Sequence, residues 1–166
     1  MSYSIDSFWV FSTSFYAEPG VGAACLTLQD EHGYDVVMIL GACYAAATGA
    51  APLSDETMAK LVAASAPWRM EVVGMLRQIR RDMKTLHDPI GIPASSQIRE
   101  EVKRVELAAE RALIEALDSA LRGPGTASDI AGCAHQNLKT YARAVAQPFL
   151  PAAEPYIDAL IAALTP

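Results

Sequence analysis

Apolar residues recur along this chain at intervals of three or four positions, which is the spacing of one face of an α-helix. Near the N-terminus, Phe8, Phe11 and Phe15 share such a face within a stretch from about Asp6 to Ala17. No alternation of apolar and polar residues, as in a β-strand, persists for more than a few positions. The sequence therefore predicts an all-α, single-domain bundle of about seven or eight helices.

Turn and capping residues divide the first half of the chain into four helices. Pro19-Gly20 ends the first helix, and Gly33 is placed to end the second. Asp35 and Ser54 are suited to cap the third and fourth helices, with Asp6 proposed for the first. The third helix is apolar nearly all round, so we expect it at the centre of the bundle.

The second half begins with Pro67, which we expect in the first turn of a fifth helix that runs to about His87. A loop over residues 88–94 leads into a long sixth helix. Gly123-Pro124-Gly125 is the clearest break in the chain. It separates a bundle core, residues 1–122, which ends with the sixth helix at about 95–122, from a C-terminal extension, residues 123–166. The extension is expected to hold helices at about 127–146 and 152–164.

The last helix of this extension carries an amphipathic face. Its apolar side is formed by Tyr156, Ile157, Leu160, Ile161 and Leu164. Such a face can dock on the chain's own bundle, on a second copy of the chain or on another protein. The sequence leaves these alternatives open.

Opposite charges gather on the fifth and sixth helices. A basic ridge follows one flank of the fifth helix and consists of Arg69, Arg77, Arg80 and Lys84. On the sixth helix, Glu106 and Glu110 lie between two apolar seams. Because charges shielded from water are costly unless paired, we expect the ridge and the glutamates to face each other.

Three interpretations of this cluster remain open. It can be a structural network of salt bridges, or a pocket in which Arg69 and Arg77 hold an anionic ligand while Glu110 or Asp30 accepts a proton. A metal site using Glu106, Glu110 and Asp30 or Asp35 is less well supported, since no glutamate is followed by a histidine three residues later. The three histidines lack metal-ligand spacing, and no nucleophile or phosphate-binding motif occurs, so no catalytic residue, metal or cofactor is predicted.

The composition of the chain limits which partners it can bind and in which cellular compartment it is expected. With 13 basic and 19 acidic residues the net charge is −6, which disfavours nucleic acid and anionic membranes. The uncharged stretch over residues 36–53 approaches the length of a membrane span, but its flanks are acidic on both sides. No signal peptide is visible, and three dispersed cysteines suit a reducing compartment, so we expect a cytoplasmic protein.

Several short motifs resemble those of a family of small conserved proteins of unknown function found mainly in proteobacteria. They are Trp9-Val10-Phe11-Ser12, Pro19-Gly20-Val21, Ala24-Cys25-Leu26, Leu28-Gln29-Asp30 with Gly33, and Asp35-Val36. Weaker similarity continues through Trp68-Arg69 and Ala109-Glu110 to about Leu121. The segment Cys43-Tyr44-Ala45 departs from the bulkier, tryptophan-containing pattern that is usual in that family.

The resemblance implies a bacterial cytoplasmic protein of the same helical fold, and it supplies no activity. It directs attention to the same polar residues as the helical projection. The resulting candidate ligand-binding set is Gln29, Asp30, Asp35, Arg69, Arg77, Arg80, Glu106 and Glu110.

The leading hypothesis is a non-enzymatic helical binding or adaptor protein, with the C-terminal helix as a candidate contact for a second copy or a protein partner. The alternative is a small-molecule binder or enzyme that uses the Arg/Glu cluster as its polar site. Membrane association through residues 36–53 or through the tail is a third and less favoured hypothesis.

Overall fold

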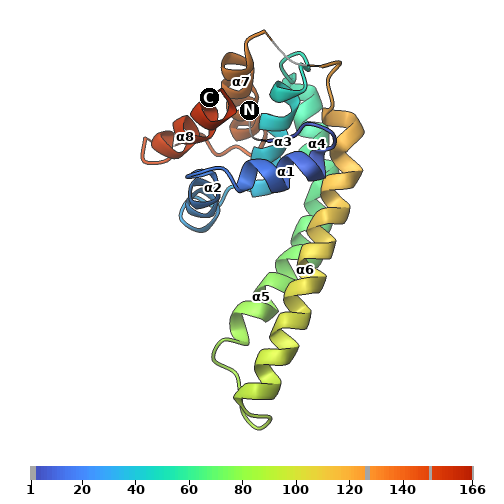
Figure 1. Ribbon diagram of the computed structural model, residues 1–166, viewed down its shortest axis with the longest axis vertical. Helices are drawn as coiled ribbons and strands as arrows, with labels where there is room; N and C mark the ends of the chain where they lie inside the picture. Colours follow the sequence, from blue (N-terminus) through green and yellow to red (C-terminus); the bar gives the residue numbers. More distant parts are fainter. Residues whose placement is uncertain (1–2, 126–127, 150, 166) are drawn as a thin grey trace. The chain divides into compact units, whose positions relative to one another are not determined.

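The computed structural model describes residues 3–125, 128–149 and 151–165, and these form helices joined by turns, without a strand (Figure 1). This confirms the predicted all-α fold. The π-helical turn η1 continues α4 directly into α5. In chain order the elements are α1 (Phe8–Tyr16), α2 (Val21–Asp30), α3 (Val36–Ala47), α4 (Asp55–Trp68), η1 (Arg69–Val73), α5 (Gly74–Asp82), α6 (Ile92–Leu121), α7 (Ile130–Ala144) and α8 (Glu154–Leu164).

The chain forms two compact units, which are described separately. The first comprises residues 1–62 and 114–166, and the second comprises residues 63–113. The first unit therefore holds α1 to α3, α7 and α8, and the second holds η1, α5 and most of α6.

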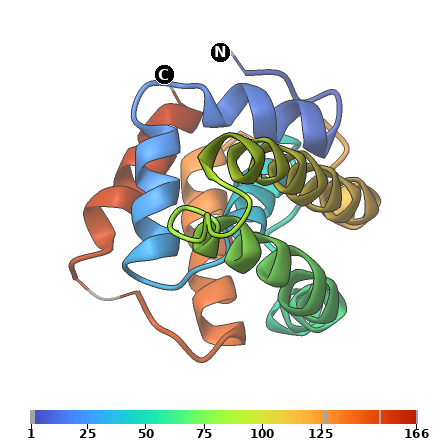
Figure 2. The ribbon, with the colours of Figure 1, turned by 90° about the horizontal axis from the view of Figure 1, so that it is seen from below.

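Helix α3 forms the centre of the first unit, as its uniformly apolar sequence predicts. It packs against α1, α2, α7 and α8, and its residues from Met38 to Ala47 are all buried. Helix α2 also lies beside α8, which is clear in Figure 2. A side chain at Gly41 would approach Leu121 Cδ1 to 3.0 Å, so glycine permits the close packing of neighbouring segments here.

Side-chain caps fix the starts of several helices. Asp35 caps α3 as predicted, because its Oδ1 accepts hydrogen bonds from the backbone N–H of Val37 at 2.7 Å and of Met38 at 3.4 Å. Ser54 accepts a bond from the N–H of Thr57 at 3.1 Å, which confirms its expected role at the start of α4. The expected cap of α1 is wrong by one residue: Ser7 rather than Asp6 caps it.

Within the first unit, hydrogen bonds to Asp118 connect α1 and α3 to the end of α6. The fully buried Tyr44 donates its hydroxyl to Asp118 Oδ1 at 2.7 Å, and the backbone N–H of Phe8 donates to the same oxygen at 2.7 Å. The Tyr44 ring also stacks on Phe8 with centroids 5.1 Å apart. Tyr44 is thus a central packing element of this chain.

The C-terminal helices pack within the first unit. Helix α7 lies along α3, and α8 contacts α2, α3 and α7. Of the predicted apolar face of α8, Ile157, Leu160 and Leu164 are buried. Gly123 lies against Ala50 in the turn between α6 and α7; the predicted start of α7 at Ala127 falls outside the described residues.

The expected helix start at Pro67 is wrong. Helix α4 runs through Pro67 to Trp68, and the chain then widens into the π-helical turn η1, in which the N–H of Gly74 bonds to the carbonyl of Arg69. Proline cannot donate its own helical hydrogen bond, and a neighbouring π-turn is one way in which a continuous helix accommodates such an interruption. The helix also ends earlier than predicted, at Asp82 rather than near His87.

Within the described ranges, no helix is both long and apolar enough to span a membrane.

Candidate functional site

The second unit is a helical hairpin in which α5 and the following part of α6 lie side by side in opposite directions (Figure 1). Hydrogen bonds to backbone carbonyls connect the two sides of this unit. Trp68 donates its indole N–H to the carbonyl of Ala109 at 3.0 Å, and Arg99 Nε donates to the carbonyl of Arg80 at 3.2 Å. Near the turn, the Ser95 hydroxyl donates to the carbonyl of Leu86 at 3.0 Å. We call residues 69–113 the hairpin.

A network of four charged side chains lies between its arms. Arg77 Nε donates to Glu106 Oε1 at 3.0 Å, and its Nη2 pairs with Glu110. Arg80 binds the same Glu106 carboxylate through Nε and Nη2. The side chain of Glu106 is only 6% exposed, so its charge depends on these partners.

The electrostatics agree with this geometry. Burial alone would raise the pKa of Glu106, but hydrogen bonds and charge from Arg80 and Arg77 outweigh it and lower the pKa below the ordinary value. The pKa of Arg77 is raised, since the two glutamates outweigh the opposing effect of burial. Glu106, Arg77 and Arg80 are therefore charged at neutral pH and compensate one another.

These contacts bring together four of the eight residues that the sequence nominated. Their opposite charges face each other between two helices, as the helical projection predicts. The donors of Arg77 and Arg80 described above are directed to glutamate oxygens, which fits a structural network that fixes the register of the two arms.

The other four nominated residues have different surroundings. Arg69 lies half-buried in η1 of the hairpin. Asp35 is the cap of α3, and its backbone N–H also donates to the Tyr141 hydroxyl oxygen at 2.9 Å. Gln29 donates to the neighbouring Asp30 carboxylate at 3.2 Å in an exposed position at the end of α2.

The hairpin exposes large apolar side chains that a helix of an ordinary core would bury. Four of them are Met75, Ile79, Ile98 and Val105, with exposed fractions of 57%, 45%, 47% and 54%. They recur at helical spacing, residues 75 and 79 on α5 and residues 98 and 105 on α6, as in the apolar stripe of an amphipathic helix. The structure shows that the inner contact between the two arms covers only part of each stripe.

These four side chains lie on one side of the hairpin. Arg80 and Glu106 point inward, toward the other arm. Ile79 comes one position before Arg80, and Val105 comes one position before Glu106. Each apolar side chain is therefore turned by about 100° around its own helix, in the same sense, from the inward-facing residue. Because the helices are antiparallel, equal rotations carry both side chains to the same side of the pair. Met75 lies one turn before Ile79, and Ile98 two turns before Val105, on the same stripes. We call these four residues the apolar face.

The chain belongs to the family described as "Protein of unknown function (DUF2390)".

The match to that family covers residues 7–117, which confirms the resemblance seen in the sequence. It includes the whole hairpin and all eight nominated residues, and it ends before α7 and α8. No curated protein and no solved structure matches the chain.

Charge is distributed unequally around the hairpin of this DUF2390 protein. Asp82 and Glu101 are exposed and lie three positions after Ile79 and Ile98, which places them beside the apolar face. Arg81 and Lys103 lie on the opposite side, near Leu107. Arg104, further from the apolar face, pairs with Glu101. Asp82 and Glu101 thus border the apolar face, whereas Lys103 on the reverse side pairs with Glu100.

Proposed function

We propose that this protein is a non-enzymatic binding or adaptor protein whose hairpin holds an amphipathic helix of a partner protein. The observation that carries the proposal is the apolar face, in which four large side chains stay about half exposed on one side of two helices. Contiguous exposed apolar surface with a polar border is typical of protein-interaction sites. A helix laid along such a face buries its own apolar stripe in the same contact.

The partner helix should carry basic residues beside its apolar stripe. Asp82 and Glu101 border the apolar face, and the whole chain has a net charge of −6. Opposite charges at the edge of an interface accelerate association and select among partners. Met75 and Ile79 on one arm and Ile98 and Val105 on the other present flexible or aliphatic side chains, so the shape of the partner's stripe is less restricted than its charge.

A second copy of the chain fits this surface less well than such a helix. A two-fold dimer would bring the same patch of both copies together. Asp82 and Glu101 would then face their own counterparts, and like charges at an interface are unfavourable. The proposal therefore commits to a different protein as the occupant.

The sequence also offered the apolar side of α8 as a candidate surface for binding a partner protein. Ile157, Leu160 and Leu164 are buried against their own chain, so the hairpin offers more apolar surface for a partner than α8 does. For this reason the proposal rests on the hairpin.

A binding experiment with designed peptides tests the proposal. The probe is a fluorescent helical peptide of three heptads with leucine at the a and d positions and lysine elsewhere, and its counterpart has glutamate in place of lysine. We expect the lysine peptide to bind the full chain with a dissociation constant on the order of micromolar, and the glutamate peptide at least tenfold more weakly. Fluorescence anisotropy measures both.

Two matched variants identify the surface. Val105 and Leu107 are two positions apart on α6, similarly exposed at 54% and 49%, and on opposite sides of the hairpin. We expect Val105→Glu to weaken the lysine peptide at least tenfold and Leu107→Glu to leave its affinity within twofold. Equal losses in both variants, or a dimer of the free protein that Val105→Glu dissociates, would refute a partner helix on the apolar face.

We further propose that the protein acts in the bacterial cytoplasm. Cys25, Cys43 and Cys133 are free and buried, and burial raises the pKa of Cys25 to about 12, so these thiols are protonated and unreactive. Such cysteines suit a reducing compartment. Fractionation of a bacterial host that carries the native gene tests this, with the protein expected in the fraction of a cytoplasmic marker and not with periplasmic enzymes.

A further inference from the structure

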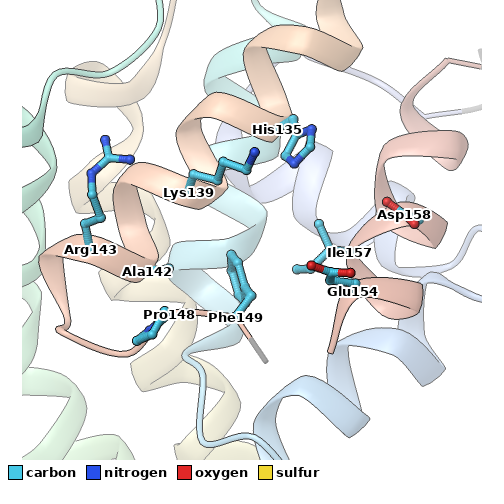
Figure 3. Close-up of a pocket in the computed structure, with 9 residues that line it drawn as sticks. All are labelled: His135, Lys139, Ala142, Arg143, Pro148, Phe149, Glu154, Ile157 and Asp158. Carbon is cyan, nitrogen blue, oxygen red and sulfur yellow. The ribbon is translucent and has the colours of Figure 1, made fainter. Parts of the chain in front are cut away.

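A second candidate site lies in the first unit, between α7, α8 and the segment that connects them (Figure 3). It is a pocket of about 460 Å³, which is within the range of small-molecule sites. The family match ends at residue 117, so the pocket belongs to the part of the chain that follows the family domain.

The two helices present opposite charges to this pocket. His135 and Lys139 are one turn apart on α7, and Glu154 and Asp158 are one turn apart on α8. Figure 3 shows the two pairs on opposite sides of the pocket, with the Lys139 side chain extended toward His135. Within the described residues, Lys139, Glu154 and Asp158 form no ion pair, so both signs of charge remain available to a ligand.

Arg143, which also borders the pocket, has other partners. Its Nη2 pairs with Asp55 Oδ1 at 2.6 Å and donates to the Thr140 hydroxyl at 3.0 Å. Figure 3 shows its guanidinium directed away from Ile157 and Glu154. Lys139 is therefore the principal cation of the site.

Apolar side chains separate the charged pairs. Ala142 and Ile157 are buried, and Phe149 and Pro148 complete the wall. Tyr34 holds this wall in place, since its ring contacts that of Phe149 at 4.6 Å and its hydroxyl donates to the carbonyl of Pro148 at 3.1 Å. A wall fixed in this way lowers the entropic cost of binding.

We propose that this pocket binds a small zwitterion with an apolar body, such as a short apolar peptide. The ligand carboxylate pairs with Lys139, its ammonium group pairs with Glu154 and Asp158, and its apolar side chains lie on Ile157 and Phe149. One molecule that carries both charges satisfies both walls, which form no ion pair with each other within the described residues. A free amino acid has the same pair of charges on a smaller body.

Calorimetric titration of the full chain with the dipeptide Leu-Leu tests the proposal. N-acetyl-Leu-Leu lacks the ammonium group, and Leu-Leu amide lacks the carboxylate. We expect Leu-Leu to bind and each modified peptide to bind about tenfold more weakly. Leucine is titrated in parallel to distinguish a peptide ligand from a free amino acid. Tighter binding of leucine than of Leu-Leu would indicate that the ligand is a free amino acid.

Two variants test which side of the pocket pairs with which charge of the ligand. Lys139→Met should weaken Leu-Leu about tenfold but leave the affinity of the amide nearly unchanged. The double variant Glu154→Gln with Asp158→Asn should weaken Leu-Leu and leave N-acetyl-Leu-Leu nearly unchanged. Lys60→Met, at an exposed lysine that does not line the pocket, is the matched control and should bind like the parent.

All substituted side chains are exposed, so circular dichroism should show unchanged folding. The proposal is wrong if Leu-Leu and leucine give no binding heat at millimolar concentration. It is equally wrong if acetylation and amidation leave the affinity unchanged, or if the wall variants do not discriminate between the modified peptides.

Discussion

Glu106 shows how one residue can determine the arrangement of two helices. Its carboxylate lies between the arms of the hairpin, almost fully shielded, and accepts bonds from both Arg77 and Arg80. Such a group is tolerable only while its partners stay in place. The register of the arms therefore depends on a few polar contacts as well as on apolar packing.

Removal of Arg77 should destabilise the hairpin. Arg77→Ala leaves Glu110 without this partner and Glu106 with Arg80 alone. We expect a loss of about 2 kcal/mol, below the value for a fully buried pair because the Arg77 side chain is 24% exposed. Urea unfolding, followed by Trp68 fluorescence in a Trp9→Phe background, measures it. Arg104→Ala, which breaks an exposed pair with Glu101, is the control and should cost less than about 0.5 kcal/mol.

Asp118 should make the stability of the protein depend on pH. Burial raises its pKa, but hydrogen bonds from Tyr44, the Phe8 backbone and Arg122 outweigh this and lower the pKa below the ordinary value. A carboxylate whose pKa is lowered in the folded state stabilises above its unfolded pKa, and this contribution disappears as the pH falls through the folded pKa.

Asp118→Asn keeps an acceptor oxygen and removes the titration. We expect the parent to be more stable than this variant at pH 7 and the difference to shrink as the pH falls from about 5 to about 3. Thermal unfolding at several pH values measures the difference. A difference that stays constant over this range would show that Asp118 does not contribute through its charge.

Much at this scale could be predicted from the sequence. Opposite charges at helical spacing on consecutive helices predicted the contact of Arg77 and Arg80 with Glu106, because shielded charges must pair. The partner of Tyr44 could not be predicted, since Asp118 is 74 positions away and helical projection treats it as part of a solvated face.

At the scale of helices and turns, the Gly123 turn tolerates no side chain. A Cβ atom there would lie 2.0 Å from the backbone nitrogen of Ala50, and backbone cannot move aside as a flexible side chain can. We expect Gly123→Ala to lower the free energy of unfolding by about 2 to 3 kcal/mol. Gly125→Ala meets nothing within 4 Å and should leave the melting temperature nearly unchanged. Equal effects of the two substitutions would contradict this account.

The predicted helix starts were correct at Asp35 and Ser54, where a side chain caps the backbone, and wrong by one residue at Ser7. Pro67 misled the sequence prediction because proline suits the first turn of a helix and the pattern carries no sign that an earlier helix continues through it. The π-helical turn at residues 69–73 depends on backbone hydrogen bonding that the order of apolar residues does not encode.

At the scale of the whole molecule, some apolar helix stripes are buried within the chain and others stay partly exposed, and the sequence could not tell which would be which. Helix α3 is buried from Met38 to Ala47, whereas Met75 and Ile79 of α5 and Ile98 and Val105 of α6 stay about half exposed. An apolar residue at helical spacing predicts a contact but does not say whether the same chain provides it. For this reason the apolar face was found in the structure and not in the sequence.

The same ambiguity applied to α8, whose amphipathic face suited the chain's own bundle or a partner. Its three buried residues contact the first unit, and the neighbouring pocket with its opposed charges became visible only once α7 and α8 were placed side by side. Residues 135 and 158 are too far apart in the sequence for spacing to indicate a common site.

The most direct measurement of the central claim is a methyl NMR titration of the full chain with the leucine/lysine peptide. The account predicts that the methyl signals of Met75, Ile79, Ile98 and Val105 shift together and saturate at one peptide per chain. The signals of Leu107, on the reverse side of the hairpin, and of Ile157, in the first unit, should stay in place. Shifts at Leu107 without shifts at Val105 and Ile79, or no shifts at saturating peptide, would contradict a partner-binding surface on the apolar face.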